Sequence, residues 1–229
     1  MSSTMELIDA IYSRHSVRRY TERGIEEGKL SVLRNAIDAA NAESGLNIQL
    51  VVNEPRAFNG LFISTYGQFS GVKNYIVMAA PKGKDWEEKV GYYGEKIVLL
   101  AQTLGLNTCW VGLTYKKTPG SFTLRSGETV HCMISLGYGE NQGKQHPQKP
   151  AKKFYEAEGE VPDWFKSGLK AALAAPTAVN QQKFKFFLKD GNKVATRTFF
   201  SPWGYTHIDL GIAKCHFEIG AGKDNFEWV

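Results

Sequence analysis

Residues 174–186 read AAPTAVNQQKFKF, and this stretch decides how the rest of the chain is interpreted. Two alanines end a helical pattern and run into Pro176, which lacks the N–H needed to continue a helix. An amide-rich loop follows, and Phe184 and Phe186 then alternate with lysine, as in a half-buried strand. Taken alone, these residues predict a helix, a polar loop and a strand. The late position of such a polar loop is the unusual feature.

Helical and strand patterns are intermixed along the chain. Apolar residues at helical spacing predict helices at 26–44, 85–106, 162–174 and 208–222. Alternating or continuous apolar runs predict strands at 47–52, 74–80, 107–113 and 130–138, and Asp190-Gly191 predicts a hairpin turn within 184–200. Regular β-α-β alternation is absent, so the sequence predicts an α+β class, a sheet covered by helices. The order helix, strand, strand, helix in 26–105 recurs in 162–222, which a duplicated architecture would explain.

The composition is that of a soluble globular protein. The 229 residues are 42% hydrophobic and 22% charged, which argues against disorder. The net charge of +5 is a mild excess that is compatible with an anionic ligand such as a phosphate, a nucleotide or nucleic acid. Dense tracts of lysine and arginine are missing, so nucleic acid is the weaker alternative and is not expected as a partner.

The three cysteines, Cys109, Cys132 and Cys215, are widely spaced and lie in apolar surroundings. An odd count without a metal-binding spacing is typical of reduced, buried thiols in the cytoplasm. No apolar run approaches the roughly 20 residues that span a bilayer, and the N-terminus does not resemble a signal peptide. We therefore expect a cytoplasmic protein that does not associate with membranes.

One glycine-rich segment, GYGENQGKQ at 137–145, resembles a phosphate-binding loop but departs from it twice. The spacing from Gly137 to Gly143 is one residue too long, and Gln145 stands where a magnesium-binding serine or threonine belongs. It also fails as a dinucleotide fingerprint, because Gln142 replaces the third glycine. Neither H-E-x-x-H nor C-x-x-C occurs, so no metal site is expected.

Another polar segment, SRHSVRRY at 13–20, concentrates Arg14, His15, Ser16 and Arg18 directly after a short helix. Guanidinium forks and a hydroxyl group converge well on a phosphate through charge-assisted hydrogen bonds. The alternative is a solvated basic turn, in which His15 merely caps the chain. The presence of other polar motifs in the chain favours ligand binding over a solvated turn.

Four segments together resemble the nitroreductase family of FMN-dependent oxidoreductases. SRHSVRRY is similar to its phosphate and isoalloxazine motif, and EKIVLLAQTLGLNTCWVG at 95–112 to its central helix and following loop. There, Glu95 replaces the usual asparagine and Asn107 a glycine. VHCMISLGYGE at 130–140, with the lysines after it, resembles a strand whose basic extension returns to the phosphate. AAPTAVNQQKFKF resembles the motif A-P-S-A-x-N-x-Q-P-W-x-F, with Thr177 in place of serine.

The order of these motifs differs from the common layout of that family, in which the A-P-S motif follows the helix after R-x-S-x-R. Here that place, residues 39–52, holds AANAESGLNIQLVV, and the motif lies in the second half. In ordinary members two identical subunits build each FMN site together. The resemblance therefore implies a single-chain pseudo-dimer with one FMN site, as in the divergent "putative TM nitroreductase" branch.

That resemblance implies a nitroreductase-like fold, with a central mixed or antiparallel sheet flanked by helices and an internal pseudo-two-fold. We expect one domain, residues 1–229, built of two unequal pseudo-repeats at about 1–158 and 159–229. Residues 14–18 and 176–180 should then meet across one flavin. The chain could be a monomer or a homodimer.

The resemblance also implies a set of cofactor-binding residues. Arg14, Ser16 and Arg18, with one or two of three lysines, would hold the phosphate and the pyrimidine edge. Thr177 and Asn180 would contact the ring or ribityl chain from the other half, although helix-stop chemistry also accounts for them. For Trp110, a buried position between helix and sheet is favoured over a contact with the flavin. The full set is Arg14, His15, Ser16, Arg18, Trp110, Val111, Gly112, Leu113, Lys149, Lys152, Lys153, Pro176, Thr177, Ala178 and Asn180.

The implied activity is that of an FMN-dependent NAD(P)H oxidoreductase. NAD(P)H would give hydride to flavin N5 and leave, and a small nitroaromatic, quinone-like or other acceptor would then take the electrons. Since the flavin carries this chemistry, no catalytic side chain is expected. The alternatives are a flavin-binding or sensor protein without turnover, and another flavin reaction on this fold, such as dehalogenation or flavin fragmentation.

Overall fold

The first sheet of the computed structural model, which describes residues 5–58, 68–147 and 149–229, is antiparallel throughout. Its strands β1 (Asn47–Val51), β2 (Asn74–Pro81), β3 (Asn107–Val111) and β4 (Glu128–Gly137) lie in the order β1-β2-β4-β3. β2 is buried over almost its whole length, as its continuous apolar run predicts. Helix α2 (Glu27–Ser44) contacts β1 and turns its apolar side, including Leu33 and Ile37, to the core.

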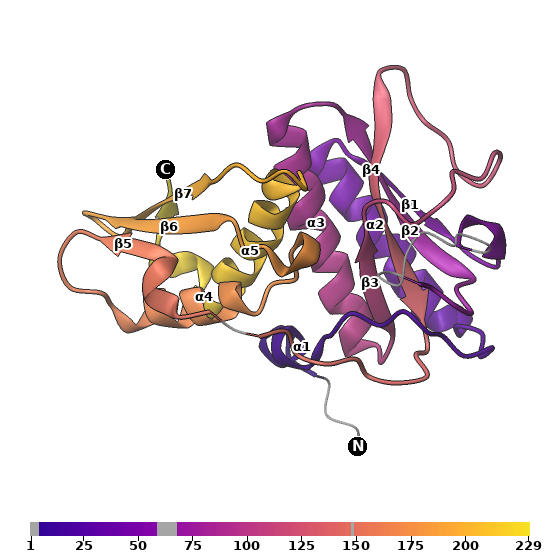
Figure 1. The fold of residues 1–229 in the computed structure, drawn as a ribbon, viewed down its shortest axis with the longest axis horizontal. Helices are drawn as coiled ribbons and strands as arrows, with labels where there is room; N and C mark the ends of the chain where they lie inside the picture. Colours follow the sequence, from indigo (N-terminus) through magenta and orange to yellow (C-terminus); the bar gives the residue numbers. More distant parts are fainter. Residues whose placement is uncertain (1–4, 59–67, 148) are drawn as a thin grey trace.

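The second sheet is mixed and belongs to the C-terminal half. Its strands β5 (Tyr155–Ala157), β6 (Phe184–Lys189), β7 (Lys193–Thr198) and β8 (Glu227–Trp228) lie in that order. β6 and β7 form the antiparallel hairpin predicted at Asp190-Gly191, while β5 and β8 add parallel strands at the two edges. The strands thus divide between two sheets, which lie at opposite ends of the molecule in Figure 1.

Two long helices, α3 (Lys84–Thr103) and α5 (Thr206–Ala221), pack against each other between the sheets (Figure 1). Glycines allow their backbones to touch. A Cβ on Gly91 would lie 2.0 Å from the carbonyl oxygen of Ile208, and one on Gly211 would lie 2.0 Å from that of Glu88. Only glycine permits so close an approach.

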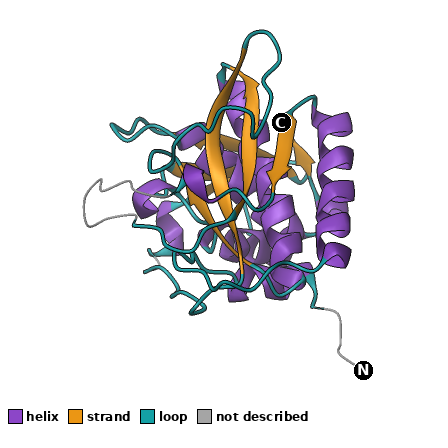
Figure 2. Ribbon diagram, turned by 90° about the vertical axis from the view of Figure 1, so that its right-hand side faces the viewer, coloured by secondary structure: helices purple, strands orange, loops and turns teal. Residues whose placement is uncertain are grey.

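The predicted recurrence of elements is confirmed. α2, β1, β2 and α3 in the first half have the same order as α4 (Asp163–Leu173), β6, β7 and α5 in the second. One apolar cluster contains Ile76 and Ile97 from the first half together with Phe165, Phe186 and Phe217 from the second. Viewed from the side, the strands of the first sheet lie in front, with helices beside and behind them (Figure 2). The α+β class is confirmed, and both halves share one core.

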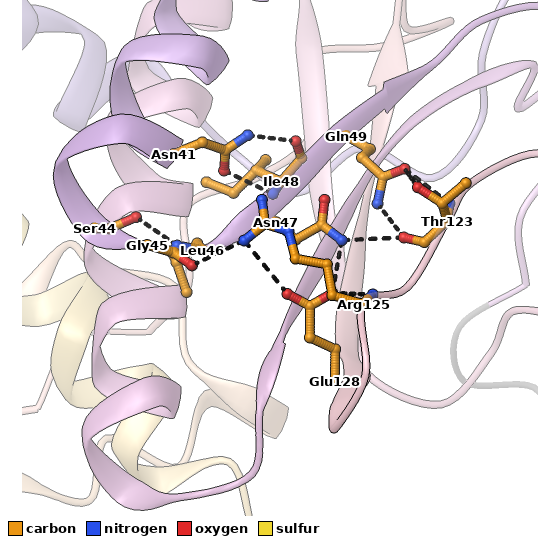
Figure 3. A network of polar contacts seen from close by, with 10 residues as sticks. All are labelled: Asn41, Ser44, Gly45, Leu46, Asn47, Ile48, Gln49, Thr123, Arg125 and Glu128. Carbon is orange, nitrogen blue, oxygen red and sulfur yellow. Dashed lines mark hydrogen bonds and ion pairs between the residues drawn. The ribbon is translucent and has the colours of Figure 1, made fainter.

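Polar contacts fix the junction between α2 and β1 (Figure 3). The Asn41 side chain donates to the carbonyl oxygen of Ile48 at 2.9 Å and accepts from its N–H at 2.8 Å. Asn47 donates to the Glu128 carboxylate at 2.7 Å, and that carboxylate also accepts the N–H of Arg125 at 2.7 Å. The start of β1 is thereby tied to the β3–β4 connection.

The three cysteines are free and buried, as predicted. Within the described ranges, no helix is both long and apolar enough to cross a membrane.

Candidate functional site

Residues 14–18 leave the end of α1 (Leu7–Ser13) and run beside β3. The N–H of Arg14 caps the helix by donating to the carbonyl oxygen of Ala10, and the N–H of Val17 donates to that of Thr108 at 3.0 Å. Val17 is buried, so its neighbours Ser16 and Arg18 point the other way, since side chains alternate along extended chain. This segment is therefore held by the β3 backbone.

The loop at residues 176–182, between α4 and β6, has a strained backbone. Val179, Asn180 and Gln182 have φ angles of 45°, 53° and 47°, which non-glycine residues and especially β-branched ones rarely adopt. The loop is held from outside by Asp209 of α5. Its Oδ1 accepts the N–H of Ala178 at 2.9 Å. Its Oδ2 accepts the side-chain amide of Gln181 at 2.6 Å.

These two segments meet at a small polar pocket of about 120 Å³. The first segment contributes two arginines, a histidine and a serine, and the second contributes proline, threonine and asparagine. A third segment, just after β4, adds Lys144, Gln145 and His146. Arg14 is only 4% exposed, and its Nε and Nη1 have no hydrogen-bond partner among the described residues. A buried cation with unused donors fits an anionic ligand.

A larger, mainly apolar cavity of about 610 Å³ adjoins this pocket. The two share Ser16, Arg18, Pro176 and Thr177 in their walls. The rest of the cavity is lined by Phe69, Trp110, Val111, Gly112, Leu113, Thr114, Cys132, Ala178, Val179, Trp203, Tyr205, Ile208, Asp209 and Ile212. A polar pocket that shares a wall with an apolar cavity suits a ligand with a charged end and a flat apolar end.

The turn after β3 is shaped by Tyr205, which immediately precedes α5. Its hydroxyl donates to the carbonyl oxygen of Gly112 at 2.9 Å. A Cβ at Gly112 would lie 2.6 Å from the Tyr205 ring. Gly112 thus allows the close approach expected of it, although the group that approaches is a side chain of the protein.

Burial raises the pKa of three ionisable groups in the cavity wall: Cys132, Tyr205 and Asp209. Burial raises the pKa of the Asp209 carboxyl to about 7, although its bonds to Gln181 and Ala178 act in the opposite direction. Burial also raises the pKa of the Cys132 thiol far above its ordinary value, so Cys132 is no nucleophile at neutral pH. In the polar pocket, burial lowers the pKa of His146.

Most of the predicted site residues line one of the two spaces. Arg14, His15 and Asn180 line the polar pocket. The apolar cavity is lined by Trp110, Val111, Gly112, Leu113 and Ala178. Both spaces are lined by Ser16, Arg18, Pro176 and Thr177. The exceptions are the three lysines. Lys149 donates to the carbonyl oxygens of Asn180 and Gln181, at 3.5 and 3.0 Å, and so supports the loop. Lys152 and Lys153 are exposed in the short helix η2 (Ala151–Lys153) and line neither space.

Lys144 and His146 are the basic residues that the sequence reasoning missed. They lie at the end of GYGENQGKQ and just beyond it, in a segment rejected for its spacing, although Lys144 was visible there. Trp203, Tyr205 and Asp209 were also missed, because only the fold brings the start of α5 to the cavity. Trp110 is partly buried, lines the cavity, and donates its indole N–H to Glu95 at 2.8 Å.

The sequence of residues 6–221 matches the family described as "Putative TM nitroreductase". A crystal structure of a "putative nitroreductase" from Thermotoga maritima superposes with a TM-score of 0.66 at 23% identity, covering 98% of this chain and 87% of that one. A "putative nitroreductase" from Desulfovibrio desulfuricans, crystallised with FMN, gives 0.50 at 17% identity, covering 69% and 99%. No curated protein matches. The predicted nitroreductase-like fold is confirmed.

Proposed function

The chain belongs to the family described as "Putative TM nitroreductase", and from that premise we propose that it is an FMN-dependent NAD(P)H oxidoreductase. It would reduce small nitroaromatic or quinone-like acceptors. Its general kind, a flavin oxidoreductase of the nitroreductase family, follows from the family match and the shared fold. The cofactor, the reductant and the acceptor are the proposal.

The observation that carries the proposal is the junction of the polar pocket with the apolar cavity. FMN has a phosphate at one end and a flat tricyclic ring at the other. The pocket offers the unpaired donors of Arg14 beside Ser16 and Arg18, and the cavity offers Trp110 and the turn after it. The residues present therefore fit FMN. The related Desulfovibrio desulfuricans protein was crystallised in complex with this cofactor.

In this proposal the two halves of the chain hold one FMN between them. Arg14, Ser16, Arg18 and Lys144 bind the phosphate and adjacent polar edge, because charge-assisted hydrogen bonds are the strongest available there. Thr177 and its neighbours in the loop contact the ribityl chain and ring from the second half. Lys149 acts through the loop carbonyls and does not touch the phosphate.

When bound, the flavin supplies the hydride chemistry, and the protein supplies binding, orientation and electrostatics. The positive charges of Arg14 and Arg18 would favour a bound flavin that carries negative charge after reduction. The walls of the cavity include the exposed apolar side chains of Leu113, Val179 and Trp203, 74%, 44% and 63% exposed respectively. These exposed side chains favour a flat, apolar acceptor, because binding such a molecule removes their apolar surface from water.

The test is a reductive and an oxidative half-reaction on the protein loaded with FMN. Under anaerobic conditions, NADH or NADPH should bleach the visible absorption band of the bound flavin. A nitroaromatic compound or a quinone should then restore it. If FMN binds but neither nucleotide reduces it, the protein is a flavin binder without turnover. If reduction occurs and neither acceptor restores the band, the acceptor class is wrong.

A further inference from the structure

A buried polar cluster lies directly behind the polar pocket, in contact with elements from both halves. At its centre is Glu95 of α3, whose side chain is fully buried. Its Oε2 accepts the indole N–H of Trp110 at 2.8 Å, and its Oε1 lies 2.9 Å from Nε2 of His216 on α5. His216 is fully buried as well. Water is therefore unable to substitute for these contacts.

The geometry requires a proton between Glu95 and His216. Nδ1 of His216 lies 3.1 Å from the carbonyl oxygen of Ala171, and a carbonyl oxygen only accepts, so Nδ1 carries a hydrogen. A deprotonated Nε2 opposite an ionised carboxylate would set two lone pairs against each other at 2.9 Å. The contact therefore holds one proton, on either the imidazole or the carboxyl group. In both arrangements the pair has no net charge.

Arg14 is the charged residue that lies between the buried Glu95 and the polar pocket. Its Nε lies 3.8 Å from the same Oε1 of Glu95, and its side chain is 4% exposed. Its Nε and Nη1 find no hydrogen-bond partner among the described residues, and it lines the polar pocket. Without His216, the ionised Glu95 would neutralise Arg14 from behind. With the proton in place, the guanidinium charge remains available to a ligand.

We propose that Glu95 and His216 are positioning residues of an anion site: by cancelling each other's charge they leave the Arg14 guanidinium free to bind a phosphate group. Glu95 stands where the family pattern has an uncharged asparagine, and His216 is the partner that makes a carboxylate tolerable there. The proposal rests on the proposed function only in identifying the phosphate as that of FMN.

The experiment compares binding of FMN, riboflavin and inorganic phosphate by four proteins. His216→Gln keeps an amide donor near Glu95 but loses the positive charge, so Glu95 stays ionised beside Arg14. An uncompensated Glu95 carboxylate, 3.8 Å from Nε of Arg14, should weaken the binding of FMN and of phosphate by about tenfold or more. Riboflavin, which has no phosphate, should bind within about twofold of its wild-type affinity. Glu88→Gln, a partly exposed position on the same helix, is the control and should change none of these affinities.

The decisive variant is Glu95→Gln combined with His216→Gln. It removes both charges, so FMN and phosphate affinity should return to within a few-fold of wild type. If the double variant binds FMN no better than His216→Gln, or if riboflavin loses affinity equally, the pair is structural and the proposal is overturned. Wild-type protein that binds phosphate in this pattern but not FMN would refute the proposed function alone.

A measurement on unliganded wild-type protein keeps the proposal testable if His216→Gln does not fold. Nitrogen-15 NMR of labelled histidine should show Nδ1 of His216 protonated. A neutral ring protonated only on Nε2 would contradict the shared proton.

Discussion

Replacing Asp209 by asparagine should change how the stability of the protein depends on pH. Burial raises the pKa of this carboxyl from 3.8 to about 7 in the fold. Between these values the unfolded chain is ionised while the folded protein keeps the proton. Asp209 therefore stabilises the fold fully below pH 4, and this contribution is lost as the pH rises through 7. Between pH 5 and pH 8 the loss comes to about 2–3 kcal/mol.

The assay is urea unfolding of wild type and Asp209→Asn at pH 5, 6, 7 and 8. At pH 5 the variant should be less stable than wild type by about 1–3 kcal/mol, because its amide N–H₂ faces that of Gln181. This deficit should shrink or reverse by pH 8, since only wild type loses the contribution of Asp209. The informative quantity is the slope. Wild type should lose about 2–3 kcal/mol more than Asp209→Asn between pH 5 and pH 8.

Controls separate this carboxyl from other titrating groups. Burial lowers the pKa of His146, which weakens the fold as the pH falls, but this contribution is common to both proteins and cancels in the comparison. Asp190→Asn, at the exposed hairpin tip, should keep the wild-type slope. Equal slopes in wild type and Asp209→Asn would refute the reasoning from burial.

Three further predictions concern the cofactor site and the central helix pair. Arg18→Ala should weaken FMN binding by about 2 kcal/mol or more, as for a lost charge-assisted contact; unchanged flavin occupancy after gel filtration would contradict its role. Lys144→Ala should weaken FMN binding measurably in a fluorescence titration, whereas Lys152→Ala should not. If instead Lys152→Ala weakens FMN binding and Lys144→Ala does not, Lys152 and not Lys144 contacts the phosphate. Gly211→Ala should lower the free energy of unfolding by about 3 kcal/mol or more, since its Cβ would lie 2.0 Å from α3 backbone. Gly28→Ala, with nothing within 4 Å, should be neutral or stabilising by up to about 1 kcal/mol in the same melts.

The sequence predicted the elements well where local chemistry determines them. The buried run of β2, the hairpin at Asp190-Gly191 and the helix ending before Pro176 all follow from periodicity and turn residues. The division of the strands between two sheets was not visible. The close packing of α3 and α5 between the sheets was not visible either, because Gly91 and Gly211, which let the two helices touch at backbone distance, mark neither a turn nor a helix end in the sequence.

The site was predicted as far as motifs reach. Residues 14–18 and 176–180 do meet at one pocket, although they lie far apart in the chain. One or two of Lys149, Lys152 and Lys153 were expected at the phosphate because a lysine-rich segment follows β4. Of these, Lys149 donates to carbonyl oxygens of the strained loop. Asp209 and His216 are single polar residues on an apolar helix pattern. Such residues become informative only when tertiary packing shows what they face.

The central claim, one FMN held by both halves of a single chain, is tested most directly by titrating the purified protein with FMN and measuring how many bind per chain. The account predicts saturation at one FMN per chain, including any flavin that copurifies with the protein. Binding of two FMN per chain, or of none, would contradict it.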